Sequence, residues 1–403
     1  MITGNQGLVK QLNKWLVLNT IRQKKGVSRA EVARVTGLNS ATVSNLSGEL
    51  LAEGLIQEFG HGQSRGGRRP ISLQVNPAGL FAVGVEIQPW AVTALIVDLV
   101  TRVVTRRVRP LGPDLSVERT VGAIVECVKE VLQDAQIPTD RQAGIGVATP
   151  GLVDHHSGIV RQSTPLGWEG VPLKAMLQQR LGLPVLVERD CFAGAAGEVW
   201  HGSGQQHRDL VFLLVDMGVG ASVVVNRQGL RGAHCGAAQV GHMTVDINGP
   251  RCNCGNYGCL EAVASGMALS RRMSAASRLA REPGAPGPER PLDLPSILQA
   301  SIDGDRQALG LLEEAGHYLG LAVANIINMY DPEVVVIGGA MPLTSPKLFS
   351  VMCSTAKARA LPLLAGQVRM TLPHFGREAC AVGAATLVLE RFFEPVQVLA
   401  VNK

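Results

Sequence analysis

The spacing of hydrophobic positions changes near residue 77 and divides the chain into a short first part and a long second part. In the first part, apolar residues recur mostly at helical spacing, and two short strand-like runs follow. This pattern predicts helices over residues 8–24, 29–35 and 40–53, then strands over 55–58 and 71–75. Asn76-Pro77 is typical of a boundary, and buried strands with amphipathic helices are predicted beyond it.

The first part also carries the local signals of a helix-turn-helix. Ser28, with Glu31 three residues later, predicts a capping box that opens the second helix. Gly37 lies in the predicted turn between the second and third helices. The two strands flank a glycine-rich loop, residues 60–70, so we predict a winged helix-turn-helix. A helical hairpin with an ordinary polar loop, used for protein contacts, is the alternative.

Small hydrogen-bonding residues on the exposed face of the third helix suit base edges and phosphates, and arginines on the loop suit a narrow minor groove. The candidate DNA contacts are Ser28, Arg29, Asn39, Ser40, Thr42, Ser44, Asn45, Arg65, Arg68 and Arg69. Asn39 or Ser40 is also the expected cap of the third helix. The residues of that helix expected to pack inward are Ala41, Val43, Leu46 and Leu50.

Charge is distributed unevenly along the 403 residues. Residues 1–76 hold ten Lys or Arg against four Asp or Glu, a net charge of +6, whereas the remainder holds 28 against 29. A basic first domain on a near-neutral body favours a polyanionic partner such as double-stranded DNA. The sequence has no run of about 18 apolar residues and no signal-peptide core, so a soluble, cytoplasmic protein with no membrane partner is expected.

Four residues in the second part have the chemistry of a structural zinc site. His242, Cys252, Cys254 and Cys259 supply one imidazole and three thiols, a full tetrahedral ligand set with no position left for water. Two glycines within the segment permit the tight turns that this spacing needs. We therefore predict one structural Zn²⁺ per chain, and three thiols packed as small hydrophobic groups are the alternative. The cysteines without ligand spacing are expected to be packing residues: Cys127, Cys191, Cys235, Cys353 and Cys380.

The sequence around these ligands resembles the signature of the ROK family, which contains sugar kinases and sugar-responsive transcriptional repressors. The resemblance rests on Gly-Ala-Ala-Gln-Val-Gly-His at residues 236–242 and on Cys-x-Cys-Gly-x-x-Gly-Cys-x-Glu at residues 252–261. It implies an α/β fold, with an N-terminal winged helix-turn-helix followed by a two-lobed actin-like (ribonuclease-H-like) ROK domain. The family usually has Ala-Gly-Glu-x-Gly-His in the first motif, so Ala238 and Gln239 depart from it.

The resemblance also implies a sugar site between the two lobes. The residues at sugar-facing positions of the family are Gly151, Arg189, Asp190, Gln239, His242 and Glu261. Asp190 matches the base that takes the proton from the sugar hydroxyl in the kinases, and Glu261 accepts hydrogen bonds from sugar hydroxyls. Arg189 replaces an asparagine that contacts sugar in the kinases. Alternatively, Asp190 merely caps the helix that follows it.

The positions that hold ATP phosphates in the kinases differ in this chain. The first phosphate loop of the kinases reads Asp-x-Gly-Gly-Thr-Lys, whereas this chain has Glu-Ile-Gln-Pro-Trp-Ala at residues 86–91. Pro89 has no amide to donate, and Trp90 fills the space that a phosphate needs. Met217 stands where the second phosphate loop has threonine. We therefore expect a protein that is not an enzyme and in which Asp190 is only the equivalent of the kinase base.

These predictions combine into a sugar-responsive DNA-binding regulator, a repressor of carbohydrate-utilisation genes. Its expected partners are an operator, a small sugar or sugar-phosphate effector and further copies of the chain, as a homodimer or higher oligomer. The expected domains are residues 1–76, residues 77–194 completed by helix 378–395, and residues 195–377 with the zinc site and the dimer interface. An active sugar kinase with a DNA-binding domain and an interaction scaffold that lost its sugar site are the alternatives.

Overall fold

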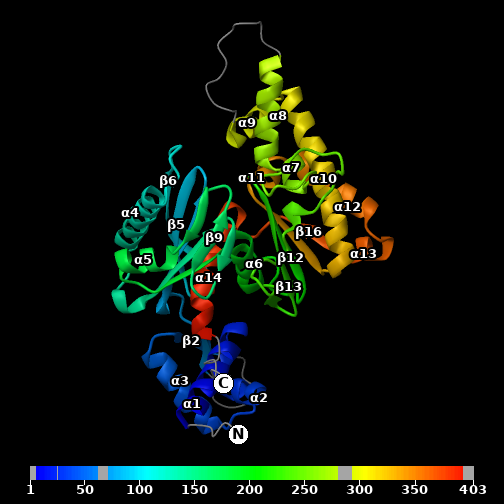
Figure 1. The fold of residues 1–403 in the computed structure, drawn as a ribbon. Helices are drawn as coiled ribbons and strands as arrows, with labels where there is room; N and C mark the ends of the chain where they lie inside the picture. The colour runs from blue at the N-terminus through cyan, green and yellow to red at the C-terminus, as the bar shows by residue number, and fades with distance from the viewer. Residues whose placement is uncertain (1–5, 25, 62–70, 280–292, 394–403) are drawn as a thin grey trace.

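The computed structural model describes residues 6–24, 26–61, 71–279 and 293–393, and it begins with a small helical unit, the head. Three helices pack on one another in the head: α1 (Gln6–Gln23), α2 (Arg29–Thr36) and α3 (Ser40–Ala52). An antiparallel sheet in the order β1-β3-β2 completes it, with β1 (Val27–Ser28), β2 (Ile56–His61) and β3 (Ile71–Val75). The helices and strands expected in residues 6–75 are therefore present (Figure 1).

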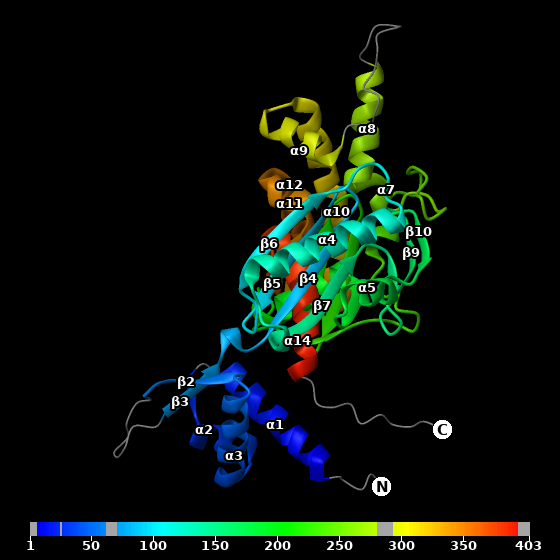
Figure 2. The same cartoon turned by 90° about the vertical axis from the view of Figure 1, so that its left-hand side faces the viewer.

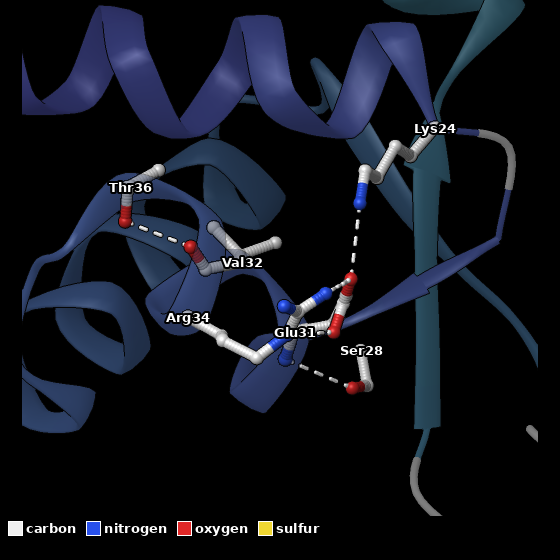
Figure 3. Close-up of polar contacts among 6 residues, drawn as sticks. All are labelled: Lys24, Ser28, Glu31, Val32, Arg34 and Thr36. Atoms are coloured by element: carbon white, nitrogen blue, oxygen red, sulfur yellow. Dashed lines mark hydrogen bonds and ion pairs between the residues drawn. The ribbon is translucent and has the colours of Figure 1, made fainter.

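The start of α2 confirms one half of the predicted capping box and corrects the other. Ser28 Oγ accepts a hydrogen bond of 3.2 Å from the backbone N–H of Glu31, as an N-cap does (Figure 3). The carboxylate of Glu31 instead accepts hydrogen bonds from Lys24 and Arg34, which also lower its pKa to about 2. A carboxylate binds two nearby cations more strongly than one neutral backbone amide. The capping-box spacing considers only Ser28 and Glu31 and therefore does not include these cations.

A five-stranded sheet forms the first lobe of the body, in the order β11-β7-β4-β5-β6. Its strands are β4 (Phe81–Gln88), β5 (Ala91–Asp98), β6 (Val103–Pro110), β7 (Gln142–Thr149) and β11 (Val185–Arg189). β4, β7 and β11 run parallel, and β5 and β6 are antiparallel to their neighbours. One face packs on α4 (Val117–Ala135) and α5 (Leu173–Leu181). A small antiparallel sheet contains β8 (Leu152–Asp154), β9 (Ile159–Ser163) and β10 (Trp168–Val171).

The second lobe has its own five-stranded sheet, in the order β14-β13-β12-β15-β16. Its strands are β12 (Leu210–Val215), β13 (Val219–Val225), β14 (Gln228–Gly229), β15 (Val334–Gly338) and β16 (Arg369–Thr371). The helices of this lobe are α7 (Leu260–Ala264), α8 (Gly266–Leu279), α9 (Leu294–Ile302), α10 (Arg306–Tyr330), α11 (Ala340–Thr344), α12 (Pro346–Arg359) and α13 (Pro362–Gln367). Over the described part of the chain, no helix is long and apolar enough to cross a membrane.

Two helices, α6 (Asp190–His201) and α14 (Ala379–Phe393), lie between the two sheets and connect the lobes (Figure 1). α14 crosses β4 and β7 so closely that a side chain at Gly84 or Gly146 would collide with carbonyl oxygens of the helix. Glycine at these two strand positions is therefore required by the approach of the helix backbone. The C-terminal helix thus packs back on the first lobe, as the sequence predicts.

The head is joined to the body by α1 and by the end of α14 (Figure 2). Asn19 donates a buried hydrogen bond of 2.8 Å to the carbonyl of Phe393. The guanidinium of Arg22 lies over the ring of Trp200 on α6, 3.9 Å from its centroid. Apolar residues of both parts belong to one hydrophobic cluster, whose members range from Val17 to Phe393. Because of these contacts, a movement of α6 or α14 would also displace the head.

Candidate functional site

The four predicted metal ligands lie together at one end of the second lobe. His242 ends a short 3₁₀ turn (Val240–His242), and Cys259 immediately precedes α7. The Nδ1 of His242 is 3.8 Å from the Sγ of Cys252, and the Sγ atoms of Cys254 and Cys259 are 3.7 Å apart. All four ligand atoms lie within 4.8 Å of one another.

These distances fit a tetrahedral metal. With Zn–S bonds of about 2.3 Å, two sulfurs of a tetrahedral site are separated by roughly 3.8 Å, close to the separations observed here. The backbone turn is tight, because Gly258 has a φ of 64° and a Cβ at this position would collide with the carbonyl of Asp246. The cluster therefore has the ligand set and the dimensions needed to hold one metal ion.

These four candidate ligands, His242, Cys252, Cys254 and Cys259, are called the metal cluster below. They border a cavity of about 300 Å³ between the two lobes. This cavity brings together residues from the end of β7, the start of α6, the β12–β13 turn, the segment before the cluster, and α7. All the residues expected to face a sugar line it: Gly151, Arg189, Asp190, Gln239, His242 and Glu261. His242 and Cys254 belong to both the cluster and the cavity wall. A cavity of this size suits a monosaccharide more than a large ligand.

Asp190 both lines the cavity and interacts with the helix it begins. It is the first residue of α6, and its Oδ1 accepts a hydrogen bond of 2.7 Å from the N–H of Cys191. Burial raises the pKa of Asp190 to about 6, so the carboxylate becomes fully ionised only near neutral pH. Asp190 is not the N-cap of α6, because Arg189 holds that position and no side chain makes a cap bond. Its remaining acceptor positions can serve a ligand in the cavity.

Two further carboxylates line the same cavity and were not expected as site residues. Burial, then the charges of Asp216 and Asp190, raises the pKa of Glu86 to about 8. Burial also raises the pKa of Asp216, which accepts hydrogen bonds from the backbone of Met217 and Ala340. With Asp190 and Glu261, four acidic groups surround one cavity and favour a ligand rich in hydrogen-bond donors. Glu86 stands at the acidic position of the first phosphate-loop pattern, which was the available signal for it.

Comparison with known proteins identifies the family to which this architecture belongs. A model described as "ROK family" matches residues 83–391. The chain belongs to the ROK family. The xylose repressor of Caldicellulosiruptor bescii is 35% identical over 337 residues, covering 83% of this chain and 84% of that protein. The xylose repressor of Bacillus subtilis strain 168 is 30% identical over 397 residues, covering 98% of this chain and 100% of that protein.

Two solved ROK structures show which part of the chain each kind of family member shares. A ROK family transcriptional regulator, described as a homolog of the Escherichia coli MLC protein, has 27% identity and a TM-score of 0.78. It covers 96% of this chain and 97% of its own. A ROK family glucokinase from Streptomyces griseus has 27% identity, a TM-score of 0.64, and covers 76% of this chain and 98% of its own. The regulator therefore matches nearly the full length, and the kinase matches a shorter part.

The departures from the ROK pattern have structural consequences in the segment before the metal cluster. Ala238 stands where the family has glycine, and it adopts a φ of 61°. A left-handed conformation costs a residue with a Cβ roughly 1–2 kcal/mol, which glycine avoids. Arg189 is buried, and its guanidinium donates a 3.1 Å hydrogen bond to the carbonyl of Ala237 in the other lobe. Arg189 therefore lines the cavity and also links the lobes.

Glu261, the carboxylate that the ROK motif contributes to the cavity, is fixed by a backbone hydrogen bond. Glu261 Oε2 accepts a hydrogen bond of 3.2 Å from the N–H of Val219 in the second glycine-rich turn. Its remaining acceptor positions can serve a ligand in the cavity. Pro89, Trp90 and Met217, the residues that replace the phosphate-binding pattern, line the same cavity.

The candidate DNA contacts of the head divide into exposed and engaged residues. Ser40, Ser44 and Asn45 are exposed on α3, whereas Thr42 is half-buried. Asn39 caps α3 through a 2.7 Å bond from Thr42 N–H, and Arg29 pairs with Glu58 at 3.1 Å. Arg65, Arg68 and Arg69 lie outside the described residues. Ala41 is exposed, so its predicted packing role is wrong: by helical spacing it lies on the same face of α3 as the exposed Ser44 and Asn45.

Glu86→Gln is expected to stabilise the protein at high pH and to change little at low pH. The pKa of Glu86 is raised to about 8 in the folded protein, so the folded state binds more protons than the unfolded chain between about pH 4.5 and 8. Its contribution to the free energy of unfolding therefore falls as pH rises through that window. Glutamine does not ionise, so the variant avoids this fall in the free energy of unfolding. At about 1.4 kcal/mol per pKa unit, the variant should have a Tm several degrees above that of the parent protein at pH 8.5.

Thermal unfolding at pH 5 and pH 8.5 checks this expectation. Glu169→Gln, at an exposed glutamate of β10, is the matched control and should shift Tm equally little at both values. An equal effect of Glu86→Gln at pH 5 and pH 8.5 would show that the buried carboxylate does not titrate in this range.

Proposed function

We propose that this ROK protein is a sugar-responsive transcriptional repressor of carbohydrate-utilisation genes. The observation that carries the proposal is a single chain in which a helical head shares a hydrophobic cluster with the body. The cavity between the two lobes of that body, called the cleft below, has sugar-binding chemistry. The two relatives described above are named as xylose repressors and align with most of this chain. A xylose-like or other small neutral sugar is therefore the first class of effector to test.

The head has the form of a winged helix-turn-helix for duplex DNA. α2 and α3 are joined by a turn whose Gly37 has a φ of 73°, and β2 and β3 bracket the loop that would be the wing. The exposed polar residues of α3 would read the major groove, while basic residues would contact phosphates. A single recognition helix reads few base pairs, so two heads on two half-sites are needed, and the body would supply the dimer interface.

Ser44→Glu is expected to weaken operator binding at least about tenfold without changing sugar binding or Tm. Ser44 is exposed on α3, where a new negative charge would face the phosphates or base edges. Ser296→Glu is the matched control, because Ser296 is exposed on α9 at the opposite end of the molecule (Figure 1). Fluorescence anisotropy with labelled operator measures both variants, and equal affinities for the two would remove this face of α3 from the DNA interface.

In the cleft, we assign the hydroxyl-accepting role to two carboxylates and a positioning role to the metal cluster. Asp190 and Glu261 would accept from sugar hydroxyls, and Arg189 and Gln239 would donate or accept at the rim. His242 has its Nδ1 toward the metal cluster, so its Nε2 would be the atom that faces the sugar. Gly151 would allow the ligand to approach the backbone.

The ion in the cluster is proposed to be zinc with a structural role. Three thiolates and one imidazole are the ligands that Zn²⁺ prefers, and they complete its tetrahedron. The bound ion would fix the segment that contains His242 and the start of α7, which places Glu261 at the cleft. The proposed domains are residues 1–76, residues 77–194 completed by α14 (Ala379–Phe393), and residues 195–377.

An active sugar kinase is the second candidate, because Asp190 occupies the position of the kinase base and a ROK glucokinase shares the body. Pro89 and Trp90 argue against it, since they occupy the wall where phosphates would be bound. Thermal-shift measurements with sugar, ATP and both together separate the candidates, because a ligand stabilises the state it binds. Sugar alone should raise Tm in a repressor, whereas added stabilisation by ATP and phosphorylated product would identify a kinase.

A further inference from the structure

A second and larger cavity lies on the other side of β11, away from the sugar cleft. Its volume is about 630 Å³, within the range of small-molecule sites. Residues of β11, α6, the β13–β14 hairpin and α14 form its walls. Polar residues are prominent among them, including His155, His156, Gln228, Glu390 and Arg391. None of the roles assigned above to the cleft, the metal cluster or the head uses this space.

The cavity wall contains buried polar atoms without hydrogen-bond partners. Ser222 Oγ, on a fully buried side chain of β13, has no partner among the described residues. The indole Nε1 of Trp200, a residue that is 6% exposed, has none there either. Buried polar groups are normally hydrogen-bonded, and an unpaired one costs about 1–3 kcal/mol. Both residues line the cavity through other atoms, because the two unpaired polar atoms are themselves buried, so they make its wall polar without reaching the open space.

The charges around the cavity favour an anion. Three arginines line it against two glutamates. Arg231 pairs with the buried Glu188, and Arg227 donates to three backbone carbonyls. Arg391 is exposed in the last turn of α14, and among the described residues no hydrogen bond or ion pair to its guanidinium is observed.

The aromatic residues of the cavity are already covered. The guanidinium of Arg231 lies 3.9 Å from the ring centroid of Phe192, and that of Arg22 lies 3.9 Å from the ring centroid of Trp200. A planar apolar ligand would have to displace these cations to stack. Hydroxyl groups, in contrast, find an amide and imidazoles on the open wall.

We propose that this cavity is a second effector site, specific for a phosphorylated monosaccharide or a similar small phosphate monoester. Arg391 would bind the phosphate together with the remaining donors of Arg231, and Gln228 would bind the hydroxyls. The site is adjacent to both functional parts of the molecule. Glu188 lines it while Asp190, two residues later, lines the sugar cleft, and Trp200 in its wall contacts Arg22 of the head.

The test measures binding to the full-length protein by calorimetry and thermal shift, with a hexose 6-phosphate, the same hexose and inorganic phosphate as probes. The variants are Asp190→Asn, which disables the cleft, and Arg391→Gln, which removes the proposed phosphate ligand. Arg359→Gln is the matched control, because Arg359 is also an exposed arginine in the last turn of a helix, α12. Neither arginine side chain is part of a hydrophobic cluster, so both variants should fold.

The hexose 6-phosphate should bind the parent protein, Asp190→Asn and Arg359→Gln equally, and Arg391→Gln about tenfold or more weakly. Inorganic phosphate should compete with it. Binding that is lost in Asp190→Asn and kept in Arg391→Gln would place the phosphate ester in the cleft and overturn the proposal. The absence of any binding to Asp190→Asn, or of competition by inorganic phosphate, would also overturn it. The sugar-responsive function is unaffected by these outcomes, since the unphosphorylated hexose is measured separately.

Discussion

Cys254→Ser is expected to remove about one zinc ion per chain and to lower Tm by roughly 8–16 °C. The fall follows from the metal, because binding at a free zinc concentration of about a thousand times Kd stabilises by about 4 kcal/mol, and 1 kcal/mol corresponds to about 2–4 °C. Cys254 is itself exposed, so the change from sulfur to oxygen should lose little packing. Metal analysis and thermal unfolding of the purified variant check both parts of this result.

Cys353→Ser is the control for the loss of a thiol, since Cys353 is half-buried and lies outside the cluster. It should keep the full zinc content and a Tm close to that of the parent protein. Full zinc content in Cys254→Ser would mean that this thiol is not a ligand. Because Cys254 and His242 line the cleft, zinc loss should also weaken sugar binding.

Asp190→Asn is expected to weaken sugar binding by roughly 10- to 150-fold, because it removes a charged acceptor worth about 1.5–3 kcal/mol. The shape of the side chain and its bond to Cys191 N–H are preserved, so the fold should be unchanged. The pKa of Asp190 is about 6, so sugar affinity of the parent protein should fall as pH drops below 6, and that of the variant should not. Calorimetric titration from pH 5 to pH 8 measures this difference.

Asp140→Asn serves as the matched control, because Asp140 is an exposed aspartate of the 3₁₀ turn before β7 and lies outside the cleft. It should keep the sugar affinity and the pH profile of the parent protein. Undiminished sugar binding by Asp190→Asn would leave Asp190 with only its local bond to Cys191 N–H and place the sugar elsewhere.

The elements of this fold could be predicted where the signal is local. The helices predicted over residues 29–35 and 40–53 are observed within one residue, at Arg29–Thr36 and Ser40–Ala52, because the side chains of Ser28 and Asn39 cap their first turns. The metal cluster was also predictable, since four ligands within eighteen residues and two glycine turns leave few ways to fold. The acceptor role of Ser28 follows from the same kind of short-range rule.

What the sequence did not predict depends on contacts between distant residues. The one local exception is Glu31, whose carboxylate pairs with Arg34 three residues later and with Lys24 just after α1 instead of with the backbone of Ser28. Glu86 and Asp216 come from different lobes, so their common cavity and raised pKa values arise only when the sheets face each other. The need for Gly146 likewise becomes clear only from the crossing of α14, whose nearest residue is more than 200 positions away.

The central claim, that sugar in the cleft controls DNA binding by the head, is tested most directly by operator affinity with and without sugar. Operator fragments from the protein's own gene neighbourhood would be titrated with full-length protein while xylose and other small sugars are added singly. A coupling of about 1–3 kcal/mol predicts a 5- to 150-fold change in operator Kd for the effective sugar, absent in Asp190→Asn. An operator affinity unchanged by a sugar that demonstrably binds the cleft would contradict the account.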